Sequence, residues 1–373
     1  MKTLNLFKFI LLGLLISGCS DSNEPTGSGS GNEPVTAITL STASNQVNIG
    51  SAVTFTVQSD VNTDVTSASS FELDGTTTTN PITFSQLGSF TVVAAYEDLT
   101  SNTLTITVVD IPASEPSDTS SFTASGAPTT FTKKALLEDF TGTWCPQCPP
   151  AGSAITNAKS GNSNIFGVGY HALNGDPMEI PETAYWSGYY RVTGFPTVYV
   201  NGPDTRWNYN SMSQVNNELA ETATVGLAVD AALVGGKLDL EVKVAFNTAA
   251  NEAVQLMIYL AEDNVTSSEP QRGSNEGADY VHKDVLRAVF TDQLGDTIEA
   301  TSTVAAGVFT RTITGIDLPS NVDDIANLKV IAFVRNTYTK TFVDYFNTTH
   351  TDSPHYDIYN VQEVHVGETQ AFD

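Results

Sequence analysis

The sequence has few cysteines, few basic residues and no apolar run long enough to span a bilayer. Its 373 residues include three cysteines, so a zinc site of four thiol and imidazole ligands has little support. Only 16 lysines and arginines stand against 42 acidic residues; the net charge of −26 excludes nucleic acid as an expected partner. No calcium-loop pattern occurs, and we expect neither a metal nor a cofactor. After the apolar run at residues 9–16, no stretch is long enough to span a bilayer.

The N-terminus has the layout of a secretory signal. Lys2 and Lys8 precede the short apolar run at residues 9–16, and Ser17-Gly18-Cys19 follows it. Residues 15–19 resemble the lipobox of bacterial lipoproteins, in which the cysteine becomes the lipidated first residue. We therefore expect Cys19 to carry the only membrane anchor, with an ordinary signal peptide as the alternative. Ser20 replaces the aspartate that retains lipoproteins at the inner membrane, so an outer-membrane location is expected, on the cell surface or the periplasmic face.

Composition divides the chain further. A Gly/Ser run at residues 26–31 and a Ser/Thr/Pro-rich stretch at 111–128 mark two tethers. We expect six segments: a signal peptide (1–18), a flexible tether (19–34), a β-sandwich (35–110), a linker (111–131), a middle domain (132–222) and a C-terminal β-rich domain (223–373).

Two of these segments have the pattern of strands. Apolar and polar residues alternate at 53–57, 90–94 and 104–108, which predicts a small β-sandwich. Residues 47–51 and 87–92 resemble bacterial immunoglobulin-like repeats, and such a module serves more often as a spacer than as a binding site. Alternation returns at 225–229 and 238–246, and residues 254–260 and 328–334 are apolar enough for strands buried on both faces. A C-terminal β-sandwich is the expected result.

The middle segment has a different order of elements. Its pattern predicts a strand at 135–140, a helix at 151–159, a strand at 165–170 and a strand at 197–200. This order is typical of thioredoxin and predicts an α/β thioredoxin-like domain. The expected fold class is therefore an all-β immunoglobulin-like sandwich, an α/β thioredoxin-like domain and a C-terminal β-sandwich.

The chemistry expected of the middle segment lies in one motif. Cys145 and Cys148 form a CxxC at the start of the predicted helix, where the helix dipole lowers a thiol pKa. Cys145 is the candidate nucleophile, and Cys148, one turn later, is the candidate resolving thiol. Trp144 directly precedes the motif and Asp139 lies six residues before it, as in thioredoxins. That resemblance implies that Asp139 accepts a proton. It also implies that Pro196, in a loop resembling the cis-proline loop, faces the dithiol and that the backbone next to Pro196 pairs with an extended substrate segment.

Other interpretations of the CxxC stay open. It could be a static structural disulfide or half of a zinc site. Two prolines, Pro149 and Pro150, follow at once, and the second is expected to cost a helical hydrogen bond. An aromatic-rich insertion at residues 172–192 is expected to cap the fold, with a wall facing the substrate as the alternative.

A family resemblance covers roughly residues 130–373. Residues 136–149, together with 280–287, resemble the outer membrane protein 28-related lipoproteins of Bacteroidetes-type bacteria. The resemblance implies a thioredoxin-like domain followed by a β-rich domain at the outer membrane. Within the second stretch, His282 and Arg287 are either a functional pair or, more often for such residues, structural.

Two hypotheses of function follow. In the first, the chain is a thiol-disulfide oxidoreductase or isomerase that acts on exported or surface proteins through Cys145 and Cys148. In the second, it is a non-catalytic surface protein for binding or assembly, and the thioredoxin fold is a scaffold.

Overall fold

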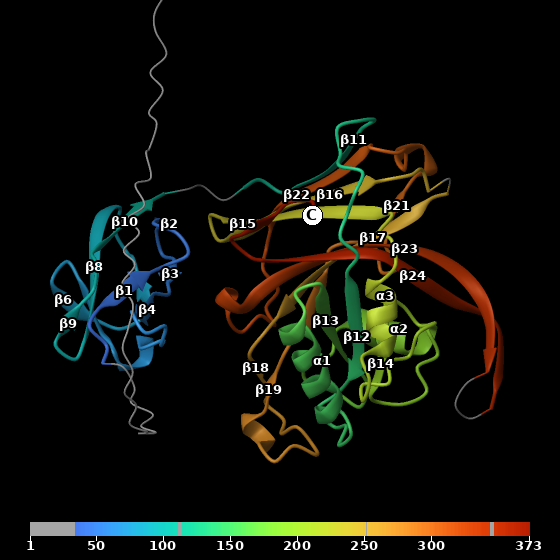
Figure 1. Cartoon of the computed structure of the whole chain (residues 1–373), viewed down its shortest axis with the longest axis horizontal. Coiled ribbons are helices and arrows are strands. Elements are labelled where there is room, and N and C mark those ends of the chain that lie inside the picture. Colours follow the sequence, from blue (N-terminus) through green and yellow to red (C-terminus); the bar gives the residue numbers. More distant parts are fainter. Residues whose placement is uncertain (1–33, 111–113, 251, 344–346) are drawn as a thin grey trace, which may run out of the picture.

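The computed structural model describes residues 34–110, 114–250, 252–343 and 347–373. The predicted signal peptide, the lipidation site Cys19 and nearly all of the first tether lie outside the described residues. The described residues form a small β body, blue in Figure 1, and a larger body that contains the helices α1 to α3. Within the described residues, no helix is both long and apolar enough to cross a membrane.

The small body is built from ten short strands with their own core. Its largest sheet has the order β2-β10-β8-β5-β6, with β9 paired to β8, and the pairs β1–β4 and β3–β7 complete it. Phe55, Val57, Phe84, Val92 and Ile106 are almost fully buried at its centre. Its elements are β1 (Ile38–Ser41), β2 (Gln46–Asn48), β3 (Ala52–Val53), β4 (Thr56–Ser59), η1 (Thr66–Ala68), β5 (Ser70–Leu73), β6 (Thr76–Thr78), β7 (Ile82–Thr83), β8 (Gly88–Tyr96), β9 (Leu99–Thr100) and β10 (Leu104–Val109).

An eight-stranded sheet runs through the larger body. Its order is β14-β12-β13-β20-β17-β23-β24, and β21 pairs with β17. The β12–β13 and β13–β20 pairs are parallel, and the other pairs are antiparallel. Its strands are β12 (Ala135–Thr141), β13 (Ile165–His171), β14 (Thr197–Val200), β17 (Val254–Glu262), β20 (Val285–Val289), β21 (Asp296–Ile298), β23 (Leu328–Val343) and β24 (Thr349–His365).

A five-stranded sheet covers one face of the eight-stranded sheet. Leu256, Ile258 and Leu260 of β17 pack with this second sheet, whereas Met257 and Tyr259 pack on the opposite face. Both faces of β17 are thus buried, which explains its nearly continuous apolar sequence. The five-stranded sheet has the order β11 (Ser117–Thr123), β22 (Val308–Ile316), β16 (Lys237–Phe246), β15 (Val225–Val234) and β25 (Thr369–Gln370).

Three α-helices cover the part of the eight-stranded sheet near β12. The apolar side chains of α1 and α3 pack against Ala135 and Leu137 on one face of β12. On the other face, Trp186 of α2 packs against the rings of Tyr170 and Tyr259. The remaining elements are α1 (Pro149–Gly161), α2 (Pro181–Tyr189), α3 (Ser213–Leu219), β18 (Val265–Thr266), η2 (Gly277–Asp279), β19 (Val281–His282), η3 (Ala300–Ser302) and η4 (Ile325–Asn327).

The predicted fold class is wrong. The strands at 135–141, 165–171 and 197–200 were expected to form an α/β thioredoxin-like domain, but they belong to the same sheet as four long or buried strands from after residue 250. The junction is at β13, where the Gly169 amide donates to the Asp284 carbonyl at 2.7 Å. A parallel strand with a free edge needs a partner for its backbone, and β20 supplies it. The described part of the larger body is therefore one mainly β structure and not an α/β domain followed by a sandwich.

Several local elements agree with the sequence. The predicted helix at 151–159 lies within α1, and the strands predicted at 165–170 and 197–200 correspond to β13 and β14. The insertion at 172–192 contains α2, and Trp186, 2% exposed, lies in the core, so this side chain helps to cap the fold. Part of the expected linker, residues 117–123, forms β11 and pairs with β22.

Candidate functional site

The Cys145–Cys148 pair forms a disulfide at the start of α1. The two Cα atoms are 5.5 Å apart, and the two residues are only 2% and 3% exposed. Pro149 and Pro150 are the first two residues of the helix, where an N–H has no acceptor within the helix. The expectation that Pro150 costs a hydrogen bond is therefore wrong. Because these two residues have no N–H group, the start of the helix stabilises a thiolate mainly through the helix dipole and less through hydrogen bonds.

Trp144 and the Pro196 loop lie beside the disulfide loop. The indole N–H of Trp144 donates to the Ala172 carbonyl at 3.0 Å, and its ring lies 5.2 Å from that of Phe195. The Phe195–Pro196 peptide bond is cis. The fold thus brings together the residues around Trp144 and Pro196, which are about fifty positions apart in the sequence.

A buried carboxylate that the sequence analysis did not single out holds the loop. Asp176 accepts hydrogen bonds from the Thr143 amide (2.6 Å), the Thr143 hydroxyl (3.1 Å) and the Met178 amide (2.9 Å), and His171 Nδ1 lies 3.2 Å from it. Burial by itself raises the pKa of Asp176, but these partners outweigh it and the pKa is lowered. Its only sequence signal is a Gly-Asp-Pro turn, which many surface loops share.

Asp139 lies on the face of β12 that α1 covers. Asp139 is 5% exposed, and its Oδ1 has no hydrogen-bond partner within the part of the chain that the structure describes. Burial, and secondly the nearby Asp284 carboxylate, raise the pKa of Asp139 to about 8. This carboxyl group therefore exchanges its proton close to neutral pH, which is a property of acid–base groups at functional sites.

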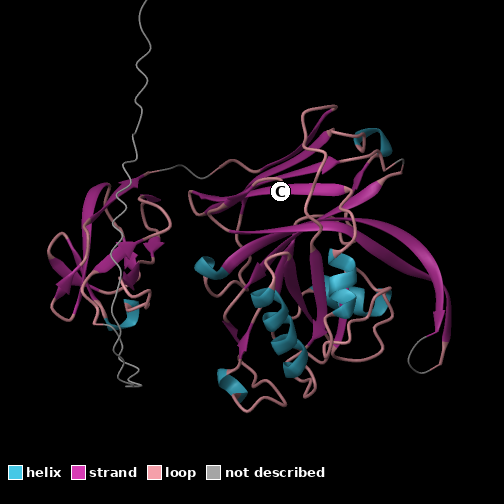
Figure 2. Ribbon diagram, in the orientation of Figure 1, coloured by secondary structure: helices cyan, strands magenta, loops and turns pink. Residues whose placement is uncertain are grey.

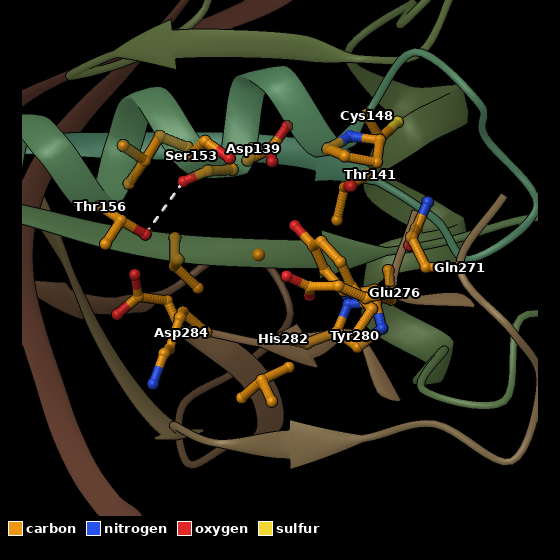
Figure 3. A pocket seen from close by; sticks show the side chains of 18 of the residues that line it. Asp139, Thr141, Cys148, Ser153, Thr156, Gln271, Glu276, Tyr280, His282 and Asp284 are labelled. Atoms are coloured by element: carbon orange, nitrogen blue, oxygen red, sulfur yellow. Dashed lines mark hydrogen bonds between the residues drawn. The ribbon is translucent and has the colours of Figure 1, made fainter. Parts of the chain in front are cut away.

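A cavity of about 350 Å³ connects Asp139 with Cys148. It lies between α1, β13 and the segment around β19 (Figure 3). Figure 3 shows Tyr280, His282 and Glu276 on the wall opposite Asp139. The other residues at its wall include Thr141, Ser153, Thr156, Gln271 and Asp284.

A buried charge cluster closes the far side of the cavity. Asp284 forms ion pairs with Lys159 of α1 and with Lys329 of β23, which is 1% exposed. Lys329 also lies 3.1 Å from Asp263 and 3.4 Å from Glu363. Burial by itself lowers the pKa of Lys329, but the three carboxylates outweigh it and raise the pKa. The cluster links the helix that carries the disulfide to the long β23–β24 hairpin.

Residues 267–280, between β18 and β19, lie against the disulfide loop; we call them the covering segment. The Gln271 side-chain amide donates to the Cys145 carbonyl at 3.0 Å, and the Arg272 amide donates to the Thr143 carbonyl at 2.8 Å. Gly273 has φ +78°, and a Cβ there would overlap the Pro146 carbonyl and lie 2.8 Å from the Pro146 Cα. Close approach of the two backbones therefore requires glycine at this position.

Replacing Gly273 by alanine should expose the disulfide. The added methyl group cannot fit against Pro146, so the covering segment must move away, and we expect dithiothreitol to reduce the disulfide about tenfold faster or more. The rate is measured by quenching with an alkylating reagent and counting modified thiols by mass spectrometry.

Gly277→Ala is the matched control. Gly277 lies in the same segment and also has a positive φ of 57°, but a Cβ there would meet no atom within 4 Å. Its reduction rate should stay within about twofold of the parent chain. Equal rates for both variants would mean that the covering segment does not limit access to the sulfurs.

His282 and Arg287 have separate roles in the structure. Arg287 pairs with Glu262 at 2.7 Å and with Asp323 at 2.9 Å, away from the disulfide. His282 lies in the cavity wall, with its ring 5.0 Å from that of His171. Among the residues described, no group of three or more histidine, cysteine or acidic side chains is arranged to hold a metal ion.

The chain is similar to one known protein family and to solved structures. The model of the family described as outer membrane protein Omp28 matches residues 183–370. HBP35 of Porphyromonas gingivalis is a similar solved structure, with 18% identity and a TM-score of 0.50 over 64% of this chain and 77% of that chain. A protein from Agrobacterium tumefaciens aligns at 15% identity and a TM-score of 0.39 over 67% of this chain and all of that one. No curated protein matches the chain. At such identities the HBP35 similarity concerns the fold alone.

Proposed function

The chain belongs to the outer membrane protein Omp28 family, and we propose that this exported protein carries out thiol-disulfide exchange on other exported proteins. Cys145 is the attacking thiol and Cys148 the resolving thiol. Asp139 accepts the proton of Cys148, and the cis-proline loop at Pro196 borders the place where a substrate strand would lie. Attachment through a lipid at Cys19 is part of the proposal.

The observation that carries the proposal is the unpaired acid beside the disulfide. Asp139 is buried, its Oδ1 has no partner, and it lines the same cavity as Cys148. A purely structural disulfide gains nothing from such a neighbour, because burying a carboxyl oxygen without a partner costs free energy. A thiol that must lose a proton in every cycle does gain from it, since an acid with a pKa of about 8 accepts that proton near neutral pH.

A Cys148→Ser variant tests this proposal. Without the resolving thiol, Cys145 should stay attached to its substrate, so non-reducing gels of cells that express the variant should show mixed disulfides that disappear with dithiothreitol. Cys145→Ser is the control and should give none. Absence of mixed disulfides with the Cys148→Ser variant, both in cells and with a disulfide-containing peptide, would contradict the proposal.

A second candidate function follows from the burial of the sulfurs. Cys145 is only 2% exposed, and the covering segment bonds to its loop, which suits a static disulfide in a protein for surface binding or assembly. In this case the small body at residues 35–110 is a spacer. A Cys145→Ser, Cys148→Ser double variant would then keep its partner and its phenotype in cells, whereas an exchange enzyme would lose the phenotype.

A further inference from the structure

The cavity wall opposite Asp139 comes from a part of the chain far away in the sequence. Tyr280 and His282 stand at this wall with their rings 4.8 Å apart, and Glu276 lies at its exposed end (Figure 3). His282 is 6% exposed and its Nε2 has no hydrogen-bond partner among the described residues. Two buried polar atoms without partners, His282 Nε2 and Asp139 Oδ1, therefore border one cavity.

Such a cavity suits water. Its volume of about 350 Å³ accommodates on the order of ten molecules at about 30 Å³ each. Buried polar atoms are nearly always hydrogen-bonded to protein or water, so the two unpaired atoms are natural ends for a chain of water. The Tyr280 hydroxyl and the Ser153 hydroxyl add further donors and acceptors between them.

The charges that face this path are distributed so that the wall itself stays neutral. Burial, and secondly His171, lower the pKa of His282 to about 3, and burial together with Asp139 and Glu276 raises the pKa of Tyr280. Both side chains are thus uncharged at neutral pH. The other ionisable groups that face the path are His171 on β13, Asp284 with its partners Lys159 and Lys329, and Lys283 and Glu276 near the rim.

We propose that Tyr280 and His282 are positioning residues that hold a water path between Asp139 and solvent, and that this path removes the proton that Cys148 loses in each exchange cycle. The inference rests on the proposed function. It gives a role in exchange to Tyr280 and His282, which lie outside the CxxC motif.

The exchange step moves one proton and two electrons. When a substrate sulfur is joined to Cys145, the Cys148 thiol gives its proton to the Asp139 carboxylate. The Cys148 thiolate then bonds to the Cys145 sulfur, and the bond between Cys145 and the substrate sulfur breaks. The substrate leaves as a thiolate with the electron pair of that bond, so the cysteine pair loses two electrons and the substrate disulfide gains two. Asp139 passes its proton along the water path to solvent, which leaves it ionised. A dithiol of another protein must then reduce the Cys145–Cys148 disulfide, and is itself oxidised, before the next cycle.

The test uses the full reduced chain and an aromatic disulfide, 5,5′-dithiobis(2-nitrobenzoate). Attack by Cys145 releases the first coloured thiolate, and attack by Cys148 on the mixed disulfide releases the second, so stopped-flow absorbance separates the two steps. Tyr280→Phe and His282→Leu should slow the second phase about tenfold and change its pH profile between pH 5 and 9, with the first phase unchanged. His282→Gln, which keeps a hydrogen-bonding group, should restore part of the rate.

Val281→Ala is the control, because Val281 lies on the same strand and at the same cavity but has no polar atom. If the second phase and its pH profile in the Tyr280→Phe and His282→Leu variants match those of the parent chain, the water path is wrong while exchange itself stands. If the parent chain never releases the second thiolate, the proposed function fails instead. Tyr280→Phe removes a single oxygen atom, so its result does not depend on whether the larger change at His282 disturbs the fold.

Discussion

Replacing Lys329 by methionine is expected to destabilise the chain by about 3–5 kcal/mol at pH 7, because removing one partner of a buried ion pair leaves the opposite charges uncompensated. Lys329 is 1% exposed and is the cation nearest Asp263 and Glu363, whereas Asp284 would keep Lys159. Urea unfolding followed by circular dichroism measures the loss.

The loss should shrink as the pH falls. Burial raises the pKa of Glu363, and Lys329 helps to lower that of Asp263, so without the lysine both carboxylates take up protons more readily in the folded chain. Once they are protonated near pH 4, little unpaired charge is left and the variant recovers part of its stability. Lys237→Met is the control: Lys237 is 27% exposed, its partner Asp317 is 85% exposed, and less than about 1 kcal/mol should be lost. Equal losses at both positions would mean that the cluster is not a buried charge network.

Asp139→Asn should make the chain more stable, and increasingly so at higher pH. The folded chain holds the Asp139 proton up to a pKa of about 8, against an ordinary value of 3.8. Between these values the folded state binds more protons than the unfolded state, so the stability contributed by this group is fully present below pH 4 and is lost as the pH rises through about 8. The asparagine does not ionise. We therefore expect the variant to be about 2–5 kcal/mol more stable than the parent at pH 9 and nearly equal at pH 4.

The same variant should lose exchange activity. Without a proton acceptor beside Cys148, the second thiolate in the stopped-flow experiment should appear roughly 10 to 100 times more slowly. Asp279→Asn carries the same change in charge at an exposed position of the covering segment and should affect neither stability nor rate. A gain in stability at pH 9 without any loss of rate would mean that Asp139 is buried for a reason other than exchange.

The Lys329→Met and Asp139→Asn variants test two parts of one electrostatic arrangement. Asp284, held by Lys159 and Lys329, raises the pKa of its neighbour Asp139 after burial itself. The charge cluster therefore influences the protonation of the acid beside Cys148. Gly167 of β13 leaves room for the Asp284 side chain, because a Cβ at Gly167 would lie 2.7 Å from a carboxylate oxygen of Asp284.

The local features of the site could be predicted from the sequence. The CxxC was identified from its spacing, and Trp144 and Asp139 from the resemblance of their positions to those in thioredoxins. The helix that begins after Cys148 follows from a local pattern. Alternating residues indicated β8, β15 and β16, because the side chains of a strand point to opposite faces whatever its neighbours are. Apolar runs indicated β17 and β23, whereas β22 and β24 were not predicted. The signal-like N-terminus, the lipobox-like residues before Cys19 and a family resemblance added the expectation of an exported outer-membrane protein.

How these strands and loops join depends on contacts between segments that are far apart in the sequence. Whether β13 ends a small domain or pairs with β20 depends on backbone hydrogen bonds between residues more than one hundred positions apart, and periodicity contains no record of such partners. For the same reason the sequence could not place Gly273 against Pro146, Lys329 beside Asp284, or Tyr280 and His282 across a cavity from Asp139. The residues nearest the disulfide were predictable because their positions follow from one turn of chain. Those that cover it, charge its surroundings and line its cavity were brought there by the sheet.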